Sequence, residues 1–178
     1  DLGQIYKAEA ALKKAVKLNP FSPDAYCNLG RVYGAQKRYA EAEREFRKQI
    51  EIVPLDPHSH RALGRVLVEQ GKYAEAVTQL EKAVAMNADD AWLHVSLGTA
   101  QFGLKHPDRG LESFERAAEL DPSPQVLIDV ATTLAERKTG LDRAQHFGES
   151  AVATLTAQMR NVRLDRLTLG DLANVNHL

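Results

Sequence analysis

The dipeptide Leu29-Gly30 recurs as Leu63-Gly64 and again as Leu97-Gly98, each pair 34 residues after the one before. A fixed interval of this length is characteristic of a chain built from repeated units. Three further series keep the same step: small residues (Ala42, Ala76, Gly110, Ala144), large apolar residues (Phe46, Leu80, Phe114, with Gly148 breaking the series) and prolines (Pro20, Pro54, Pro122, with Ala88 in the gap). Several independent series in one register predict a repeat architecture.

Each unit carries the signals of helix starts. A capping oxygen stands just before a proline at Ser22-Pro23, Asp56-Pro57 and Ser123-Pro124. Proline suits the first position of a helix, because its missing N–H has no partner there and its φ is already helical. Apolar residues then follow at helical spacing, as expected for an amphipathic helix.

Glycines inside these helices predict close packing. Gly30 and Gly64 each cost about 1 kcal/mol relative to alanine, so we expect a neighbouring helix to lie close to both. Ala42 and Ala76 would allow the same approach from the partner helix. Turns between paired helices are predicted at Lys37-Arg38-Tyr39 and Gly71-Lys72-Tyr73, and no segment predicts a strand.

The pattern resembles the tetratricopeptide repeat, a helix–turn–helix unit with this period. The resemblance implies an all-α fold, a right-handed superhelical α-solenoid that buries its core between neighbouring repeats. The expected organisation is the second helix of a truncated repeat at 1–22, repeats at 23–56, 57–90 and 91–124, a degenerate repeat at 125–158, and a capping segment or the start of a further repeat at 159–178.

The C-terminal part departs from the pattern. Because Gly148 leaves the fourth unit without a large side chain, we expect this unit to loosen first on unfolding. Residues 142–160 predict one longer helix. Thr168 and Asp171 have the spacing of a capping box, which predicts a last short helix with Leu172, Val175 and Leu178 on its apolar face. End helices left without a neighbour would favour self-association.

Composition excludes some classes of partner. The 178 residues carry a net charge of −1 with both signs interspersed, which is not the basic footprint of a nucleic-acid-binding protein. The apolar runs are too short to cross a membrane. The first residues do not resemble a signal peptide, although a start inside a repeat is compatible with a leader or domain upstream. The single Cys27 does not indicate a compartment, and the composition suits a bacterial cytoplasm or periplasm.

The chain has no motif typical of catalysis. His58 and His60 form the only close histidine pair, and no cysteine or carboxylate with metal-ligand spacing accompanies them. We interpret them as a solvated helix start. Cys27 has no evident histidine partner, so we expect a half-buried thiol rather than a nucleophile. No enzymatic activity, metal or cofactor is therefore expected.

The resemblance also implies a concave groove, lined by the first helices of successive units, that binds a peptide or a partner protein. The residues that it places in the groove are Cys27, Asn28 and Arg31 from the first unit, His58, Arg61, Ala62 and Arg65 from the second, Trp92, Ser96, Thr99 and Phe102 from the third, and Asp129, Thr133 and Glu136 from the fourth.

Three of these groove residues are arginines. Arg31, Arg61 and Arg65 would attract a carboxylate or phosphate through bidentate hydrogen bonds, with Trp92 and Phe102 offering apolar contacts. This predicts an acidic peptide ligand. The competing interpretation is that the arginines pair with local acids such as Glu69 and that Trp92 packs internally.

Two better-known kinds of tetratricopeptide groove do not match. The kind that clamps the terminal carboxylate of chaperone tails has Lys, Asn and Arg where this chain has Cys27, Arg31, Ala62, Trp92 and Ser96. The kind with an asparagine ladder would need asparagine at each of Asn28, Ala62, Ser96 and Val130. Three hypotheses stay open: a peptide-binding scaffold, a regulatory or targeting segment of a larger enzyme, and a self-associating adaptor.

Overall fold

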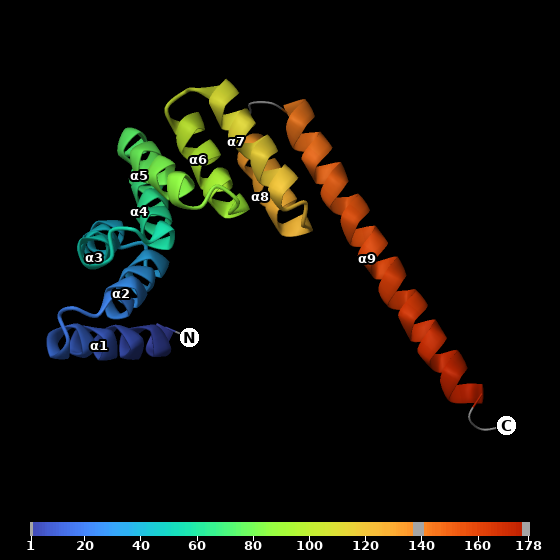
Figure 1. The fold of residues 1–178 in the computed structure, drawn as a ribbon, viewed down its shortest axis with the longest axis horizontal. Coiled ribbons are helices and arrows are strands. Elements are labelled where there is room, and N and C mark those ends of the chain that lie inside the picture. The colour runs from blue at the N-terminus through green and yellow to red at the C-terminus, as the bar shows by residue number, and fades with distance from the viewer. Residues whose placement is uncertain (1, 137–140, 176–178) are drawn as a thin grey trace. The chain divides into compact units, whose positions relative to one another are not determined.

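The computed structural model describes the backbone of residues 2–136 and 141–175, and the side-chain surroundings of residues 3–136, 142–158 and 160. These residues form α-helices and no strand (Figure 1), which confirms the all-α prediction. The helices are α1 (Leu2–Leu18), α2 (Pro23–Ala35), α3 (Tyr39–Ile52), α4 (Pro57–Glu69), α5 (Tyr73–Met86), α6 (Ala91–Gly103), α7 (Pro107–Leu120), α8 (Pro124–Glu136) and α9 (Leu141–Val175). They fall into two compact units, Asp1–Leu120 and Asp121–Leu178.

Capping side chains fix where three helices begin. Ser22, Asp56 and Asp90 each accept a hydrogen bond from a backbone N–H group in the first turn of α2, α4 and α6, respectively. Such caps satisfy donors that have no partner within the helix. Ser22 and Asp56 were predicted as caps, whereas Asp90, which precedes alanine rather than proline, was not.

The turn inside each of the first three helix pairs has the same backbone conformation. Lys37, Gly71 and Lys105, spaced by 34 residues, have φ angles of 58°, 73° and 62°. One residue further on, a backbone N–H donates to the carbonyl five residues back, as in a Schellman motif. These bonds run from Arg38 to Tyr33, from Lys72 to Leu67 and from His106 to Gln101.

Glycine sets the helix spacing within the pairs of unit Asp1–Leu120. A Cβ atom added to Gly30 would lie 2.8 Å from Cε1 of Phe46, and one added to Gly64 would lie 2.6 Å from Cγ of Leu80. These distances are shorter than a van der Waals contact, so a larger residue would force the helices apart. The predicted close approach is confirmed, and Phe46 and Leu80 are both buried.

An ionic cluster joins α1 to the α2–α3 pair. The carboxylate of Glu9 accepts hydrogen bonds from Lys13 at 2.6 Å, Gln36 at 3.2 Å and Arg38 at 2.8 Å. Arg38 also forms an ion pair with Glu41. A similar cluster recurs 34 residues later, between the α2–α3 and α4–α5 pairs, where Glu43 accepts hydrogen bonds from Arg47, Gln70 and Lys72. Here Glu75, which corresponds to Glu41, forms its ion pair with Arg47 rather than with Lys72.

The next junction, between the α4–α5 and α6–α7 pairs, departs from this pattern. Val77 stands at the position of Glu9 and Glu43, and Leu104 stands at the position of Gln36 and Gln70. Val77 is part of the hydrophobic core and Leu104 packs against that core. Apolar packing therefore replaces the ionic cluster here.

Unit Asp121–Leu178 contains α8 and α9, which pack against each other. The prediction that Gly148 leaves this pair without a large apolar side chain was wrong. Phe147 is buried together with Ala144 and Ala151. Positions 147 and 148 lie three and four residues after Ala144, and such positions share one face of a helix. The ring of Phe147 therefore fills the place in which the repeat register predicts a large side chain at position 148.

Helix α9 is longer than the sequence suggested. It runs without interruption from Leu141 to Val175, so the separate helix start predicted at Thr168 and Asp171 was wrong. The predicted capping box has no helix end to satisfy inside a continuous helix. The apolar face predicted for Leu172, Val175 and Leu178 lies outside the residues whose side chains are described.

Candidate functional site

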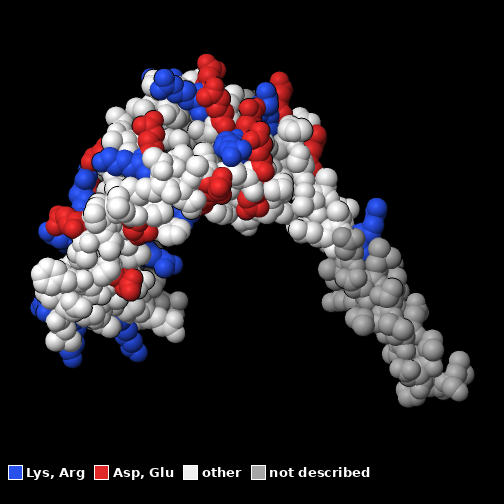
Figure 2. All heavy atoms as spheres, viewed as in Figure 1, with Lys and Arg blue, Asp and Glu red and all other residues white. Residues whose placement is uncertain are grey.

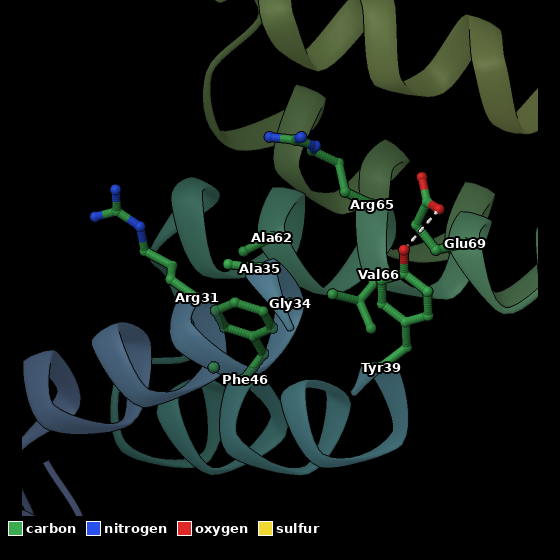
Figure 3. A pocket seen from close by; sticks show the side chains of 10 residues that line it. Arg31, Gly34, Ala35, Tyr39, Phe46, Ala62, Arg65, Val66 and Glu69 are labelled. Carbon is green, nitrogen blue, oxygen red and sulfur yellow. Dashed lines mark hydrogen bonds between the residues drawn. The ribbon is translucent and has the colours of Figure 1, made fainter. Parts of the chain in front are cut away.

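A cleft of about 380 Å³ lies between α2 and α4 (Figure 3). Four of its lining residues come from each of these two helices, and two come from α3. Ligand pockets commonly have volumes in this range. The lining residues are Gly30, Arg31, Gly34, Ala35, Tyr39, Phe46, Ala62, Arg65, Val66 and Glu69.

Two arginines on the cleft wall are one repeat apart. Arg31 of α2 and Arg65 of α4 are both exposed. Figure 3 shows both side chains extended, with the guanidinium groups away from the ring of Phe46. Among the described residues, neither guanidinium makes a hydrogen bond or an ion pair. Both can therefore form charge-assisted bonds with an incoming acidic group.

A tyrosine and a glutamate close another side of the cleft. The hydroxyl of Tyr39 donates a hydrogen bond to Oε2 of Glu69 at 3.1 Å, across the junction between the two helix pairs. Partial burial raises the pKa of the Tyr39 hydroxyl, and the hydrogen bond to the Glu69 carboxylate raises it further. The phenol therefore stays protonated and donates to Glu69, and within the described residues Glu69 forms no ion pair with Arg65.

Small residues form the floor of the cleft. Gly34, Ala35 and Ala62 line the cleft together with the ring of Phe46 (Figure 3). A Cβ atom added to Gly34 would meet no other atom within 4 Å, in contrast to Gly30 one turn earlier. The space above Gly34 is therefore open to a ligand.

Family models of the tetratricopeptide repeat match residues 21–89 and 61–125, and a third model, described as the TPR repeat, matches residues 1–37. Together they span most of the chain. This chain belongs to the tetratricopeptide repeat family. No curated protein matches it at a significant level.

Solved tetratricopeptide structures share the fold. TTC0263, a thermophilic TPR protein of Thermus thermophilus, has a TM-score of 0.73 and 20% identity, covering 94% of this chain and 92% of that one. MamA (41-end) from Desulfovibrio magneticus RS-1 gives 0.72 and 22%, covering 86% and 88%. YrrB, described as a TPR protein with an unusual peptide-binding site, gives 0.63 and 23%, covering 93% and 85%. At these identities the likeness shows the fold alone.

Of the groove residues predicted from the tetratricopeptide resemblance, Arg31, Ala62 and Arg65 line the cleft. Asn28 and His58 are exposed, and Cys27 is half-buried, but none of these three lines the cleft. Burial raises the pKa of the Cys27 thiol, so the thiol stays protonated near neutral pH and is a poor nucleophile.

Arg61 was predicted to act with the other two arginines, but it is already paired. Its Nη1 atom donates to Oδ2 of Asp90 at 3.1 Å, and both side chains are mostly buried. Asp90 also caps α6. Arg61 therefore stabilises the start of the next helix, and only Arg31 and Arg65 remain for a ligand.

The prediction that Phe102 offers an apolar contact in the groove was wrong. Its ring is buried and stacks on Phe114 with centroids 5.5 Å apart, close to Gly110. Phe102 is the next-to-last residue of α6, and its side chain packs against α7. Trp92, Ser96 and Thr99 of α6 are partly exposed, and the two hydroxyls donate to backbone carbonyls one turn back.

The groove residues predicted in the fourth repeat lie on α8. Asp129 accepts a hydrogen bond from Gln125 at 3.3 Å, the hydroxyl of Thr133 donates to the carbonyl of Asp129, and Glu136 is exposed. They belong to unit Asp121–Leu178, whereas the cleft residues belong to unit Asp1–Leu120.

The prediction of a solvated helix start fits His58, which is exposed, but was wrong for His60. His60 is buried, and its ring nitrogens lie 2.9 Å from Oε1 of Gln79 and 3.0 Å from the carbonyl of Pro54. Within the described part of the chain, no group of three or more His, Cys, Asp or Glu side chains is placed to hold a metal. Nor does that part contain a helix long and apolar enough to cross a membrane.

Sequence reasoning missed Gly34, Ala35, Tyr39, Val66 and Glu69 as cleft residues. One signal was present for the first of these. The repeat register puts Val68 and Phe102 at the positions that correspond to Gly34. A glycine at a position where the next two repeats have large apolar residues indicates a place on the surface where a side chain is missing.

Proposed function

We propose that this chain is a protein–protein interaction scaffold that binds an acidic segment of a partner protein in the cleft between α2 and α4. The observation that carries the proposal is the pair of unpaired guanidinium groups, Arg31 and Arg65, beside an open floor of small residues. The tetratricopeptide fold supports the scaffold role.

The chemistry of the cleft favours carboxylates. A guanidinium group binds a carboxylate through two parallel hydrogen bonds, and both are charge-assisted. Positive and negative side chains are intermingled over the face seen in Figure 2, and the net charge is only −1. Attraction of an acidic segment must therefore come from these two local charges, which makes it sensitive to salt.

The test compares peptide binding by the wild type and two charge-matched variants. Arg31→Ala/Arg65→Ala removes both cleft charges. Lys82→Ala/Arg109→Ala removes two exposed charges outside the cleft. We expect acidic peptides to bind the wild type, to lose roughly tenfold or more in affinity on the first variant, and to bind the second nearly as well as the wild type. Equal losses on both variants, or a preference for neutral peptides, would overturn the proposal.

Self-association is a second candidate, favoured by exposed apolar side chains. Tyr6 and Leu18 on α1 are 63% and 76% exposed, and Phe21 and Leu55, one repeat apart, are 81% and 80% exposed. Burying such residues in a contact between copies would be favourable. Sedimentation over a range of concentrations tests this, with Phe21→Ser/Leu55→Ser as the variant that should reduce association. A monomer at every concentration excludes it.

A further inference from the structure

One position in the repeat register differs between the three helix pairs of unit Asp1–Leu120. Gly34, Val68 and Phe102 follow one another at intervals of 34 residues. The ring of Phe102 stacks on Phe114 with centroids 5.5 Å apart and an angle of 18° between planes. Val68 packs against the hydrophobic core. At Gly34 the side chain is absent.

An aromatic ring lines the same cleft as Gly34. Phe46 occupies the position that corresponds to Phe114. Each of these rings lies against the glycine of its own Leu-Gly pair, Phe46 against Gly30 and Phe114 against Gly98. Phe46 borders the cleft, as does Gly34. The third pair also has Gly110 beneath the Phe102 ring, where an added Cβ would lie 2.4 Å from Cδ2, whereas the first pair has the buried Ala42 at that position. The cleft therefore leaves Phe46 accessible to an incoming side chain, in a placement different from that of Phe102.

Internal packing does not explain the glycine. Glycine is disfavoured inside a helix, and Gly30, Gly64 and Gly98 are retained because an added Cβ would meet a neighbouring side chain. Gly34 has no such neighbour within 4 Å. Its effect is to leave open the cleft of about 380 Å³ that a larger side chain would occupy.

We propose that this cleft takes one aromatic side chain of the partner segment, packed against Phe46 and the small residues beside it. The inference rests on the proposed function and specifies its ligand as an aromatic residue flanked by acidic residues. The carboxylates bind Arg31 and Arg65 on the cleft wall. A guanidinium group also packs well against an aromatic face, so the two kinds of contact support each other.

The experiment measures binding of three peptides of equal length to the wild-type chain. The first has a central phenylalanine between acidic residues, the second has alanine at the centre, and the third keeps the phenylalanine but has amide side chains instead of acidic ones. We expect about a tenfold loss of affinity in the second and a comparable, salt-dependent loss in the third.

Two substitutions at one position separate filling of the cleft from effects on the helix. Gly34→Phe places a ring in the cleft from the chain itself. We expect it to lower the affinity for the phenylalanine peptide to that of the alanine peptide. Gly34→Ala should lower the affinity for the phenylalanine peptide less than Gly34→Phe does, because one methyl group fills little of the cleft.

Equal affinity for the phenylalanine and alanine peptides would overturn the inference, even if the Gly34→Phe variant failed to fold. If acidic peptides still lost affinity on Arg31→Ala/Arg65→Ala, the proposed function would stand without its aromatic anchor. Absence of binding by any acidic peptide would overturn both. Concentration-dependent association of the chain alone that Gly34→Phe abolishes would also overturn the inference, by showing that a second copy fills the cleft.

Discussion

Lys72 donates a hydrogen bond from Nζ to Oε2 of Glu43 at 2.8 Å, and it does so across the junction between the α2–α3 and α4–α5 pairs. The corresponding contact one repeat earlier, from Arg38 to Glu9, has the same length. At these two junctions the 34-residue period therefore extends to polar contacts between repeats as well as to the apolar core. Glu43 is the centre of its cluster, since Arg47 and Gln70 also donate to it.

Replacing Glu43 by glutamine should destabilise the fold in a pH-dependent way. Burial raises the pKa of the Glu43 carboxyl, but hydrogen bonds from Lys72, Arg47 and Gln70 outweigh burial and lower the pKa from 4.5 to about 2. A carboxyl with a lowered folded-state pKa stabilises the fold above its unfolded pKa, and this contribution is lost as the pH falls through the folded value. We expect Glu43→Gln to lower the free energy of unfolding by roughly 2 kcal/mol at pH 7.

Urea unfolding between pH 7 and pH 2 measures this effect. The difference between wild type and Glu43→Gln should shrink from about pH 4.5 downward and approach zero near pH 2. Glu112→Gln, at an exposed position of α7, serves as the control. A difference that stays constant over this range would show that the ionised carboxylate contributes nothing.

The turn residues provide a second prediction. Lys37 and Gly71 occupy corresponding positions with φ of 58° and 73°, where a side chain is unfavourable. We expect Lys37→Gly to stabilise the protein by about 1 kcal/mol and Gly71→Ala to destabilise it by a similar amount. Thermal unfolding checks both. If the two substitutions shift the melting temperature in the same direction, the conformational explanation fails.

Substitution of a helical glycine should depend on what lies opposite. A Cβ atom at position 98 would lie 2.5 Å from Cε1 of Phe114 and 3.0 Å from the carbonyl oxygen of Gly110. We expect Gly98→Ala to destabilise the fold by about 1 to 3 kcal/mol, although alanine favours a helix. Gly34→Ala, where the added atom meets nothing, should stabilise it by about 1 kcal/mol. Chemical denaturation distinguishes these opposite signs.

The α8–α9 pair should depend on Phe147. This ring is buried, whereas Val152 on the same helix is 63% exposed. We expect Phe147→Ala to destabilise the pair by about 3 kcal/mol and Val152→Ala to have little effect. Hydrogen exchange should show reduced protection of α8 amides in Phe147→Ala, with α2 to α5 unchanged. Equal protection in both variants would show that the ring does not hold this pair together.

The helix pairing was predictable because close packing restricts residue size. Where α2 meets α3, only glycine fits at position 30 opposite Phe46, and such a restriction is visible in the sequence as Leu29-Gly30. The turn at Lys37 was also predictable from the sequence, because it separates two stretches with helical spacing of apolar residues. Its left-handed conformation was not predicted, since lysine gives no signal for a positive φ.

The cleft was only partly predictable. Arg31 and Arg65 followed from their place in the repeat, but the pairing of Arg61 with Asp90 depends on the distance between residues in different repeats. Phe102 was assigned to the groove from its position on the first helix of its pair, although the end of that helix faces α7. Phe147 was missed because the fourth repeat places its ring one residue out of register.

The replacement of Glu43 by Val77 at successive junctions gives the α4–α5 pair two unlike ends. A duplicated α2–α3 pair would set Glu43 and Arg47 against the Gln36, Arg38 and Glu41 of its own copy, so that each charge would lie near an opposite one. A duplicated α4–α5 pair would instead set Lys72 against Val77, whose side chain offers no hydrogen-bond acceptor. The first complete repeat is therefore better suited than the second to lie beside a copy of itself.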